Sequence, residues 1–267
     1  MKCSVIVLNY NGKELLEEYL PSVVEAAGKS RHDCRVIVLD NASGDDSVPF
    51  LKKHFPALQV WIAPQNKVLC SYNSLVEELE DDVVLLLNND IRLEKGHVDP
   101  LLAVFEREKD VFFAASHGNR SIARFHWGVL SPEVGYEGRE KLMEERGYSL
   151  SAGVAVFDRK KFLELGGYDE LYLPGRYEDV DLCYRGWKRG WKGYYEPASR
   201  QEHYKNDIGG ASFSKAFDHA ATQAMVFRNS LLFTVKNMTD PAILLQAFVR
   251  RRPRWARQTA CHRRSPE

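Results

Sequence analysis

An unbroken apolar run covers residues 83–87 and stops at the polar tip Asn88-Asn89-Asp90. A run of this length, β-branched at its start, predicts a central strand of a parallel sheet that is covered on both faces. The polar tip would then lie at the carboxyl edge of the sheet, where open α/β sheets bind ligands. Its oxygens suit a hard cation such as Mg²⁺ or Mn²⁺, although Asn and Asp also favour turns on their own account.

Strand-like and helix-like patterns alternate along the first 115 residues. Strands are predicted at 3–8, 35–39, 60–62, 83–87 and 111–115, and helices at 13–27, 46–54, 71–80 and 98–107. This alternation is typical of an α/β fold with a Rossmann-like, mainly parallel sheet and right-handed crossovers. The chain has neither GxGxxG after its first strand nor GxxxxGK[ST] anywhere, so any bound phosphate needs a cation to hold it.

Two other predicted strands also end in polar residues. Asn9 follows the first strand, and Asp40 follows the second, shortly before Ser43. An acid at this place can accept hydrogen bonds from a base edge or a ribose hydroxyl. Asp40 and Ser43 are equally suited to capping the helix that follows.

Residues 117–150 interrupt the alternation with glycines and aromatic residues placed among charged ones. A long segment of this kind inside a compact domain predicts a binding loop or lid, and we expect it to hold a second substrate. A strand at 154–157 and a short helix at 159–165 are predicted to follow.

A second group of acids opens an amphipathic helix at Glu178-Asp179-Val180-Asp181. The helix dipole favours acids in a first turn, and Asp181 with Arg185 makes an i,i+4 pair, so a structural role is open to them. The adjacent acids Glu178 and Asp179 point in different directions, so one can face a cleft while the other braces the backbone. Further on, His203 lies alone among polar residues. A lone histidine more often has a structural role than a metal-binding one, although imidazole is a common metal ligand.

Charge and cysteine usage narrow the class of protein. The 37 basic and 37 acidic residues cancel, which does not indicate a nucleic-acid partner. Five cysteines without CxxC spacing predict neither a disulfide framework nor a zinc site, and they fit a reducing cytosol. The first strand leaves no room for a signal peptide, and no apolar run reaches the roughly 20 residues of a membrane span. We therefore expect a cytoplasmic location, or a peripheral one on the cytoplasmic face of the membrane.

The C-terminal region combines apolar and basic residues. An apolar stripe over 215–237 predicts a helix that packs on the domain, and an apolar stretch after Pro241 leads into the Arg-rich run 250–257 with Trp255. Such a combination is typical of a segment that lies on an anionic membrane surface. Past about residue 253 the composition predicts disorder.

Several short motifs occur in a specific order along residues 3–237. They are Asn9-Tyr10-Asn11-Gly12, Val38-Leu39-Asp40-Asn41-Ala42-Ser43, Leu86-Leu87-Asn88-Asn89-Asp90, Gly166-Gly167-Tyr168-Asp169-Glu170, Glu178-Asp179-Val180-Asp181-Leu182-Cys183-Tyr184-Arg185 and His203. In these motifs the chain resembles family 2 glycosyltransferases, most closely the rhamnosyltransferase-like bacterial branch that builds cell-surface polysaccharide. The resemblance implies a GT-A fold over 1–237, with a nucleotide-sugar-binding half (1–115), an acceptor-binding and catalytic half (116–237), and an amphipathic, basic tail (238–267).

The resemblance also implies roles for particular residues. It places nucleotide contacts at Asn9, Asp40, Asn66 and Asn88, metal ligands for Mg²⁺ or Mn²⁺ at Asp90 and His203, and a general base at Asp179 with Glu178 beside it. Sugar transfer from a nucleotide-diphosphate donor needs a neutralised leaving group and a deprotonated acceptor hydroxyl, which a cation and a carboxylate supply. With the base opposite the leaving group, the expected outcome is inversion. The expected partners are the nucleotide sugar and a glycan or lipid-linked acceptor.

Two positions depart from the pattern of that family. Asn88 stands where its DxD element usually begins with Asp, and Val68 stands where an Asn-x-Gly-Phe element has Gly. A branched residue disfavours the positive φ that Gly permits, and Lys67 is expected to offset this by facing phosphate. A noncatalytic GT-A-like binding subunit therefore stays an alternative. A sugar-nucleotide nucleotidyltransferase is another, although such enzymes usually bind phosphate through a Gly-rich first loop, which residues 9–12 are not.

Overall fold

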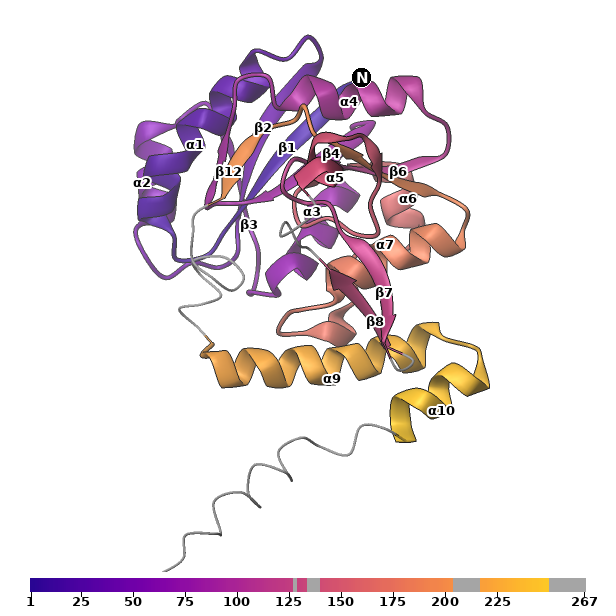
Figure 1. Ribbon diagram of the computed structural model, residues 1–267. Helices are drawn as coiled ribbons and strands as arrows, with labels where there is room; N and C mark the ends of the chain where they lie inside the picture. The colour runs from indigo at the N-terminus through magenta and orange to yellow at the C-terminus, as the bar shows by residue number, and fades with distance from the viewer. Residues whose placement is uncertain (127–128, 134–139, 204–216, 250–267) are drawn as a thin grey trace, which may run out of the picture.

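The computed structural model describes residues 1–126, 129–133, 140–203 and 217–249 (Figure 1). An eight-stranded sheet forms its centre, in the order β3-β2-β1-β4-β10-β6-β11-β9. The strands are β1 (Lys2–Asn9), β2 (Asp33–Asp40), β3 (Gln59–Ile62), β4 (Val83–Asn88), β6 (Val111–Ser116), β9 (Gly147–Tyr148), β10 (Ala155–Asp158) and β11 (Lys192–Glu196).

The parallel part of the sheet brings its polar strand ends together. Strand β1 runs parallel to β2 and β4 and pairs Asn9 with Asp40 and Leu8 with Asn88. The apolar runs of these strands are buried because helices cover both faces of the sheet. The strands predicted from apolar runs are therefore confirmed, and they place the predicted nucleotide contacts on one edge.

Strand β10 joins the two halves of the chain in one sheet. It corresponds to the strand predicted at 154–157 and runs antiparallel to β4 on one side and to β6 on the other. Beyond it, β6 and β11 are parallel to each other. The sheet is thus mixed, and mainly parallel in its first half.

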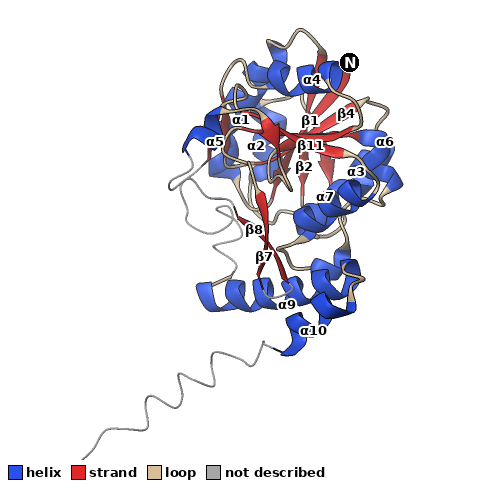
Figure 2. Cartoon of the chain, turned by 45° about the vertical axis from the view of Figure 1, so that its right-hand side comes forward, coloured by secondary structure: helices blue, strands red, loops and turns tan. Residues whose placement is uncertain are grey.

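Helices form one layer on each face of the sheet (Figure 2). One layer consists of α1 (Lys13–Gly28), α2 (Ser47–His54) and α4 (Val98–Arg107). The other consists of α3 (Tyr72–Glu78), α6 (Arg159–Glu164) and α7 (Glu178–Lys188). A short 3-10 helix, η1 (Val68–Ser71), precedes α3, and a second, η2 (Glu170–Tyr172), precedes α7.

The segment predicted as a binding loop or lid contains regular structure. Strands β7 (Ile122–His126) and β8 (Val129–Glu133) form an antiparallel hairpin, and α5 (Glu140–Glu144) follows. Both views show this hairpin reaching from the body of the molecule to α9 (Figures 1 and 2). Residues 127–128 and 134–139 of the predicted loop lie outside the described residues.

Two C-terminal helices add a third layer. They are α9 (His219–Asn237) and α10 (Pro241–Val249), and α9 shares a small core with Tyr172, Tyr177 and Val180. The helix predicted from the stripe over 215–237 is thereby confirmed from residue 219 onward. No helix in the described ranges is long and apolar enough to cross a bilayer. The basic run 250–257, and the disorder predicted past residue 253, lie outside the described residues, so the predicted membrane contact stays a prediction.

Helix α7 lies so close to the sheet that one position admits no side chain. A Cβ atom at Gly186 would lie 2.4 Å from Cδ1 of the Phe112 ring. We expect Gly186→Ala to destabilise the protein by about 1–3 kcal/mol through overpacking, which exceeds the roughly 1 kcal/mol that Ala gains over Gly in a helix. Gly28→Ala is the matched control, because nothing lies within 4 Å of a Cβ there. Urea unfolding measures both, and equal stability of the two variants would contradict the packing described.

Candidate functional site

The carboxyl ends of β1, β2 and β4 carry a buried polar network. The Asn9 amide donates from Nδ2 to Asp40 Oδ2 at 2.9 Å and accepts at Oδ1 from Asn89 Nδ2 at 2.7 Å. All three side chains are buried, and a Cβ at Gly12 would lie 2.1 Å from Asn89 Nδ2. Two of the predicted nucleotide contacts, Asn9 and Asp40, are therefore held rigidly at one edge.

Asp40 does not cap the following helix. Its Oδ1 atom accepts from the Ser43 backbone amide at 2.9 Å, which stabilises the turn after β2. Helix α2 begins later, with Asp46 at its N-cap position. The capping alternative is therefore wrong for Asp40, and its second oxygen serves the network with Asn9.

Asn66 belongs to a second network at the same edge. Asn41 donates from Nδ2 to Asn66 Oδ1 at 2.7 Å, and Ser71 Oγ donates to Asn41 Oδ1 at 2.5 Å. The Asn66 side chain is exposed, so it can contact a ligand, whereas Asn41 is buried beneath it. The sequence prediction named Asn66 but missed Asn41, whose signal was its place directly after Asp40.

Val68 adopts the backbone conformation that was expected to be disfavoured there. Its φ is +52°, which costs a non-Gly residue about 1–3 kcal/mol. The Val68 amide donates to Asn66 Oδ1 at 2.8 Å, and its carbonyl accepts from Asn41 at 3.2 Å, so these side chains hold the strained turn. Beside it, Lys67 Nζ forms an ion pair with Glu170 at 2.6 Å. The predicted phosphate contact of Lys67 stays a prediction.

The predicted metal ligands Asp90 and His203 meet at the end of β4, where Asn88 is half-buried. Strand β5 (Ile91–Leu93) pairs with β12 (Gln201–His203), and the register sets His203 opposite Ile91. His203 Nε2 consequently lies 3.6 Å from Asp90 Oδ1. The Asp90 carboxylate is buried, while the His203 ring is partly exposed.

The Asp90 and His203 side chains fit a cation that takes some of its ligands from the protein and the others from a bound substrate. Mg²⁺ is usually held by one or two carboxylates together with substrate phosphates and water, and Mn²⁺ accepts the same oxygens and imidazole. Within the described residues no group of three or more His, Cys, Asp or Glu side chains is arranged around a metal position. A cation here would therefore depend on ligands from a bound diphosphate.

The acids Glu178 and Asp179 stand at the start of α7. Burial, and next to it the charge of Asp179, raises the pKa of Glu178, whose Oε2 atom has no hydrogen-bond partner within the described residues. Burial also raises the pKa of Asp179, whose Oδ1 accepts from the Val180 amide at 2.8 Å. After burial itself, the charge of Glu178 raises the pKa of the Cys70 thiol.

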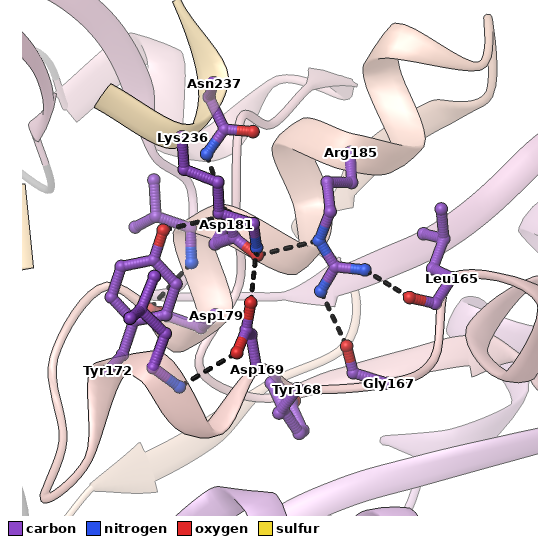
Figure 3. A network of polar contacts seen from close by, with 12 residues as sticks. Leu165, Gly167, Tyr168, Asp169, Tyr172, Asp179, Asp181, Arg185, Lys236 and Asn237 are labelled. Carbon is purple, nitrogen blue, oxygen red and sulfur yellow. Dashed lines mark hydrogen bonds and ion pairs between the residues drawn. The ribbon is translucent and has the colours of Figure 1, made fainter. Parts of the chain in front are cut away.

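Asp181 is the centre of a buried charge network (Figure 3). Its carboxylate is fully buried and accepts hydrogen bonds from side chains of η2, α7 and α9. Tyr172 Oη donates to Oδ1 at 2.9 Å, Asn237 Nδ2 to Oδ1 at 2.8 Å, Arg185 Nε to Oδ2 at 2.7 Å and Lys236 Nζ to Oδ2 at 2.7 Å. The predicted pair of Asp181 with Arg185 is confirmed, but Lys236 and Asn237 were missed.

One family model matches this chain. It is the model of glycosyl transferase family 2, and it covers residues 4–166. The chain belongs to glycosyl transferase family 2. The matched part of this family 2 chain contains the polar edge from Asn9 to Asp90 and ends before Glu178.

Comparison with other proteins gives distant relatives of the family 2 chain. It is 22% identical to Polypeptide N-acetylgalactosaminyltransferase 3 of Drosophila melanogaster over 232 residues. The aligned residues cover 75% of this chain and 34% of the relative. The family 2 chain thus spans about a third of the length of that relative.

Similar solved structures show that the family 2 chain has a GT-A fold, as predicted. A structure of GalNAc-T7 with UDP, GalNAc and Mn²⁺ has a TM-score of 0.61 at 17% identity, over 77% of this chain and 44% of that one. Mannosyltransferase PcManGT from Pyrobaculum calidifontis with GDP-Man and Mn²⁺ has a TM-score of 0.58 at 15% identity, over 99% of this chain and 76% of that one. S. aureus TarS 1-349 with UDP-GlcNAc has a TM-score of 0.59 at 18% identity, over 92% of this chain and 71% of that one.

Removing the Asp181 carboxylate should destabilise the fold strongly. Asp181→Ala leaves Arg185 and Lys236 without their buried counter-charge, which we expect to cost about 3–5 kcal/mol in urea unfolding. The control is Glu164→Ala, which breaks the exposed ion pair with Arg189 and should cost below about 1 kcal/mol. A loss at Asp181 no larger than at Glu164 would contradict the network.

The raised pKa of Glu178 makes stability depend on pH. The folded state favours the protonated carboxyl, so the associated stability is complete below the unfolded pKa of about 4.3 and is lost as pH rises through the folded pKa. Glu178→Gln removes this loss. We therefore expect its melting temperature, relative to the unchanged chain, to be higher at pH 8.5 than at pH 4.5. A difference that is the same at both pH values would show that Glu178 is not desolvated.

Proposed function

We propose that this family 2 chain transfers a sugar from a nucleotide-diphosphate donor to an acceptor hydroxyl, with a divalent cation bound and with inversion at the sugar carbon. The observation that carries the proposal is the meeting of Asp90 with His203 at the same sheet edge as the Asn9–Asp40 pair. That edge offers polar side chains for a nucleotide and a carboxylate with an imidazole beside it for a cation. The buried acids of α7 supply the base.

The donor would bind along the carboxyl edge of β1, β2 and β4. Asn9 and Asp40 would contact the nucleoside, and the exposed Asn66 and half-buried Asn88 would add contacts beside them. Solved GT-A structures similar to this chain hold UDP, GDP-Man or UDP-GlcNAc, two of them with Mn²⁺, which supports a nucleotide sugar as donor. The identity of the base and the sugar is left to experiment.

Asp90 and His203 would hold Mg²⁺ or Mn²⁺ at this edge. When bound, the cation supplies positive charge that stabilises the leaving diphosphate. The two side chains orient the diphosphate end of the donor, because they lie at the end of β4 next to the Asn9 network. Asn88 adds no charge there, so among residues 88–90 the attraction of the cation to a negative charge comes from Asp90 alone.

Asp179 would act as the general base, with Glu178 beside it. A base that removes a proton from a hydroxyl is more effective when its pKa is raised toward the working pH, and burial does this for Asp179. The two acids are close enough to influence each other, so a protonated Glu178 leaves Asp179 as the ionised member of the pair. The proton of the acceptor then passes to Asp179 as the new glycosidic bond forms.

The acceptor would be a glycan or a lipid-linked saccharide of cell-surface polysaccharide synthesis. The hairpin β7–β8 and the segment around it lie in the acceptor half and would shape its site. Apolar α10, followed in the sequence by the Arg-rich run 250–257, would keep the enzyme at an anionic membrane where lipid-linked acceptors occur. The rhamnosyltransferase-like branch fits such an acceptor.

Metal-dependent donor binding is the direct test. UDP-, GDP- and dTDP-sugars are each tested with Mn²⁺ and with EDTA. We expect the sugars of one nucleotide to raise the melting temperature, and only when Mn²⁺ is present. A ligand that binds the folded state stabilises it by about 2.7 kcal/mol at 100 times its Kd. Asp90→Asn should abolish the Mn²⁺-dependent part of this shift.

Two variants separate binding from chemistry. Asp179→Asn should keep the nucleotide shift and lower the rate of nucleoside diphosphate release about 10²–10⁴-fold, the usual contribution of a general base. Full activity of Asp179→Asn would refute its role. A nucleotide shift without any sugar transfer in the unchanged chain would favour the noncatalytic binding subunit.

A further inference from the structure

Two adjacent side chains of α9 hold the loop that leads into α7. From the end of η2 to the residues just before α7, five backbone carbonyls of residues 171–176 accept hydrogen bonds from Arg228 and Asn229. Asn229 Nδ2 lies 2.8 Å from Tyr172 O, 2.7 Å from Gly175 O and 2.8 Å from Arg176 O, which share its two hydrogens. Arg228 donates from Nη1 to Leu173 O at 2.8 Å and from Nη2 to Leu171 O at 3.4 Å. We call this arrangement the carbonyl clamp.

The clamped loop has a backbone conformation that needs outside support. Gly175, Arg176 and Tyr177 have φ values of +148°, +77° and +75°. Two of the three carry side chains that disfavour such angles, and they follow one another directly. Tyr172 O also accepts from the Gly175 amide at 2.9 Å, and the fully buried Asn229 amide supplies the side-chain donor to the carbonyls of residues 172, 175 and 176.

The clamped loop ends at the first turn of α7, which carries Asp179. Tyr177 is the N-cap residue of α7, and Asp179 is the second residue of that helix. The dihedral angles of residues 176 and 177 therefore fix the entry of the first helical turn. The Asp181 network holds the same first turn from its other side, two residues after Asp179.

We propose that Asn229 is a positioning residue of the transfer reaction, which holds the loop 171–177 so that Asp179 points at the acceptor hydroxyl. This inference rests on the role proposed above for Asp179. The donor contacts lie elsewhere, at the carboxyl edge of β1, β2 and β4. Loss of the clamp therefore affects turnover and leaves donor binding intact. A misplacement of about 1 Å is enough to lower a rate roughly 10²-fold.

The experiment compares turnover with nucleotide affinity in variants of the full chain. UDP-GlcNAc, UDP-GalNAc, GDP-mannose and dTDP-rhamnose are supplied with Mn²⁺ and with water as acceptor, and released nucleoside diphosphate gives kcat. The Kd of UDP, GDP or dTDP with Mn²⁺ is measured by calorimetry. Asn229→Ala and the isosteric Asn229→Asp should each lower kcat at least tenfold and change the Kd by less than twofold.

Thr234→Val is the matched control on the same helix. Thr234 is also fully buried, but its hydroxyl donates only to the Ser230 carbonyl one turn earlier at 2.8 Å, away from the loop. It should change neither kcat nor Kd by more than twofold. Arg228→Gln, at an exposed position, removes the weaker part of the clamp and should lower kcat by a smaller factor than Asn229→Ala.

Each outcome decides the inference. An unchanged kcat in Asn229→Ala, or a loss matched by an equal rise in Kd, would overturn it. If both Asn229 variants fail to fold, Arg228→Gln decides on the same criteria. If the unchanged chain releases no diphosphate from any of the four sugars, hydrogen exchange decides: amides 178–181 should exchange faster in Asn229→Ala than in Thr234→Val, and equal exchange overturns the clamp.

Asp179→Asn, measured in the same series, separates this inference from the proposed function. If Asp179→Asn is fully active, the proposed base is wrong whatever the Asn229 variants show. If Asp179→Asn is inactive and the Asn229 variants keep their kcat, only the positioning role of Asn229 fails.

Discussion

A single carboxylate without access to water determines how the second half of the chain is built. A buried charge is costly unless donors surround it, and Asp181 has four of them. Because these donors come from η2, α7 and α9, the three elements have to meet at one point (Figure 3). Helix α9 is thereby fixed in register, and Arg228 and Asn229, two turns before Lys236, face the loop that opens α7. The direction of Asp179 thus depends on a charge that takes no part in the chemistry proposed.

The first half of the chain depends on a different constraint, the alignment of parallel strand ends. The register of β1 with β2 and β4 sets Asn9 beside Asp40 and next to the tip of β4. Polar groups buried there must bond to one another, which makes the edge rigid before any ligand arrives. Strand β10 continues the same sheet into the second half, so the edge and the acids of α7 belong to one framework. A nucleotide sugar held at the edge would therefore meet a base whose place is already set.

The sequence predicted the parts of this arrangement that depend on local pattern. Apolar runs identified β1, β2 and β4 because strands buried on both faces carry apolar residues at consecutive positions. The meeting of Asp90 with His203 was expected only from the family resemblance, since β5 and β12 are three residues long and show no pattern. Val68 adopts a positive φ although branched residues disfavour it, because Asn41 and Asn66 make the hydrogen bonds that hold the strained turn. Asn229, buried on α9, reads in the sequence as one more polar residue, and only the fold shows what it binds.

The proposed function requires the edge formed by β1, β2 and β4 to bind a nucleotide together with a divalent cation. The most direct measurement is a crystal structure of the chain grown with Mn²⁺ and UDP or GDP, recorded at a wavelength where manganese scatters anomalously. We expect an anomalous peak bonded to Asp90 and His203 and to the diphosphate, with the nucleoside against Asn9 and Asp40. A nucleotide bound at that edge without manganese, or manganese and nucleotide bound elsewhere, would contradict it.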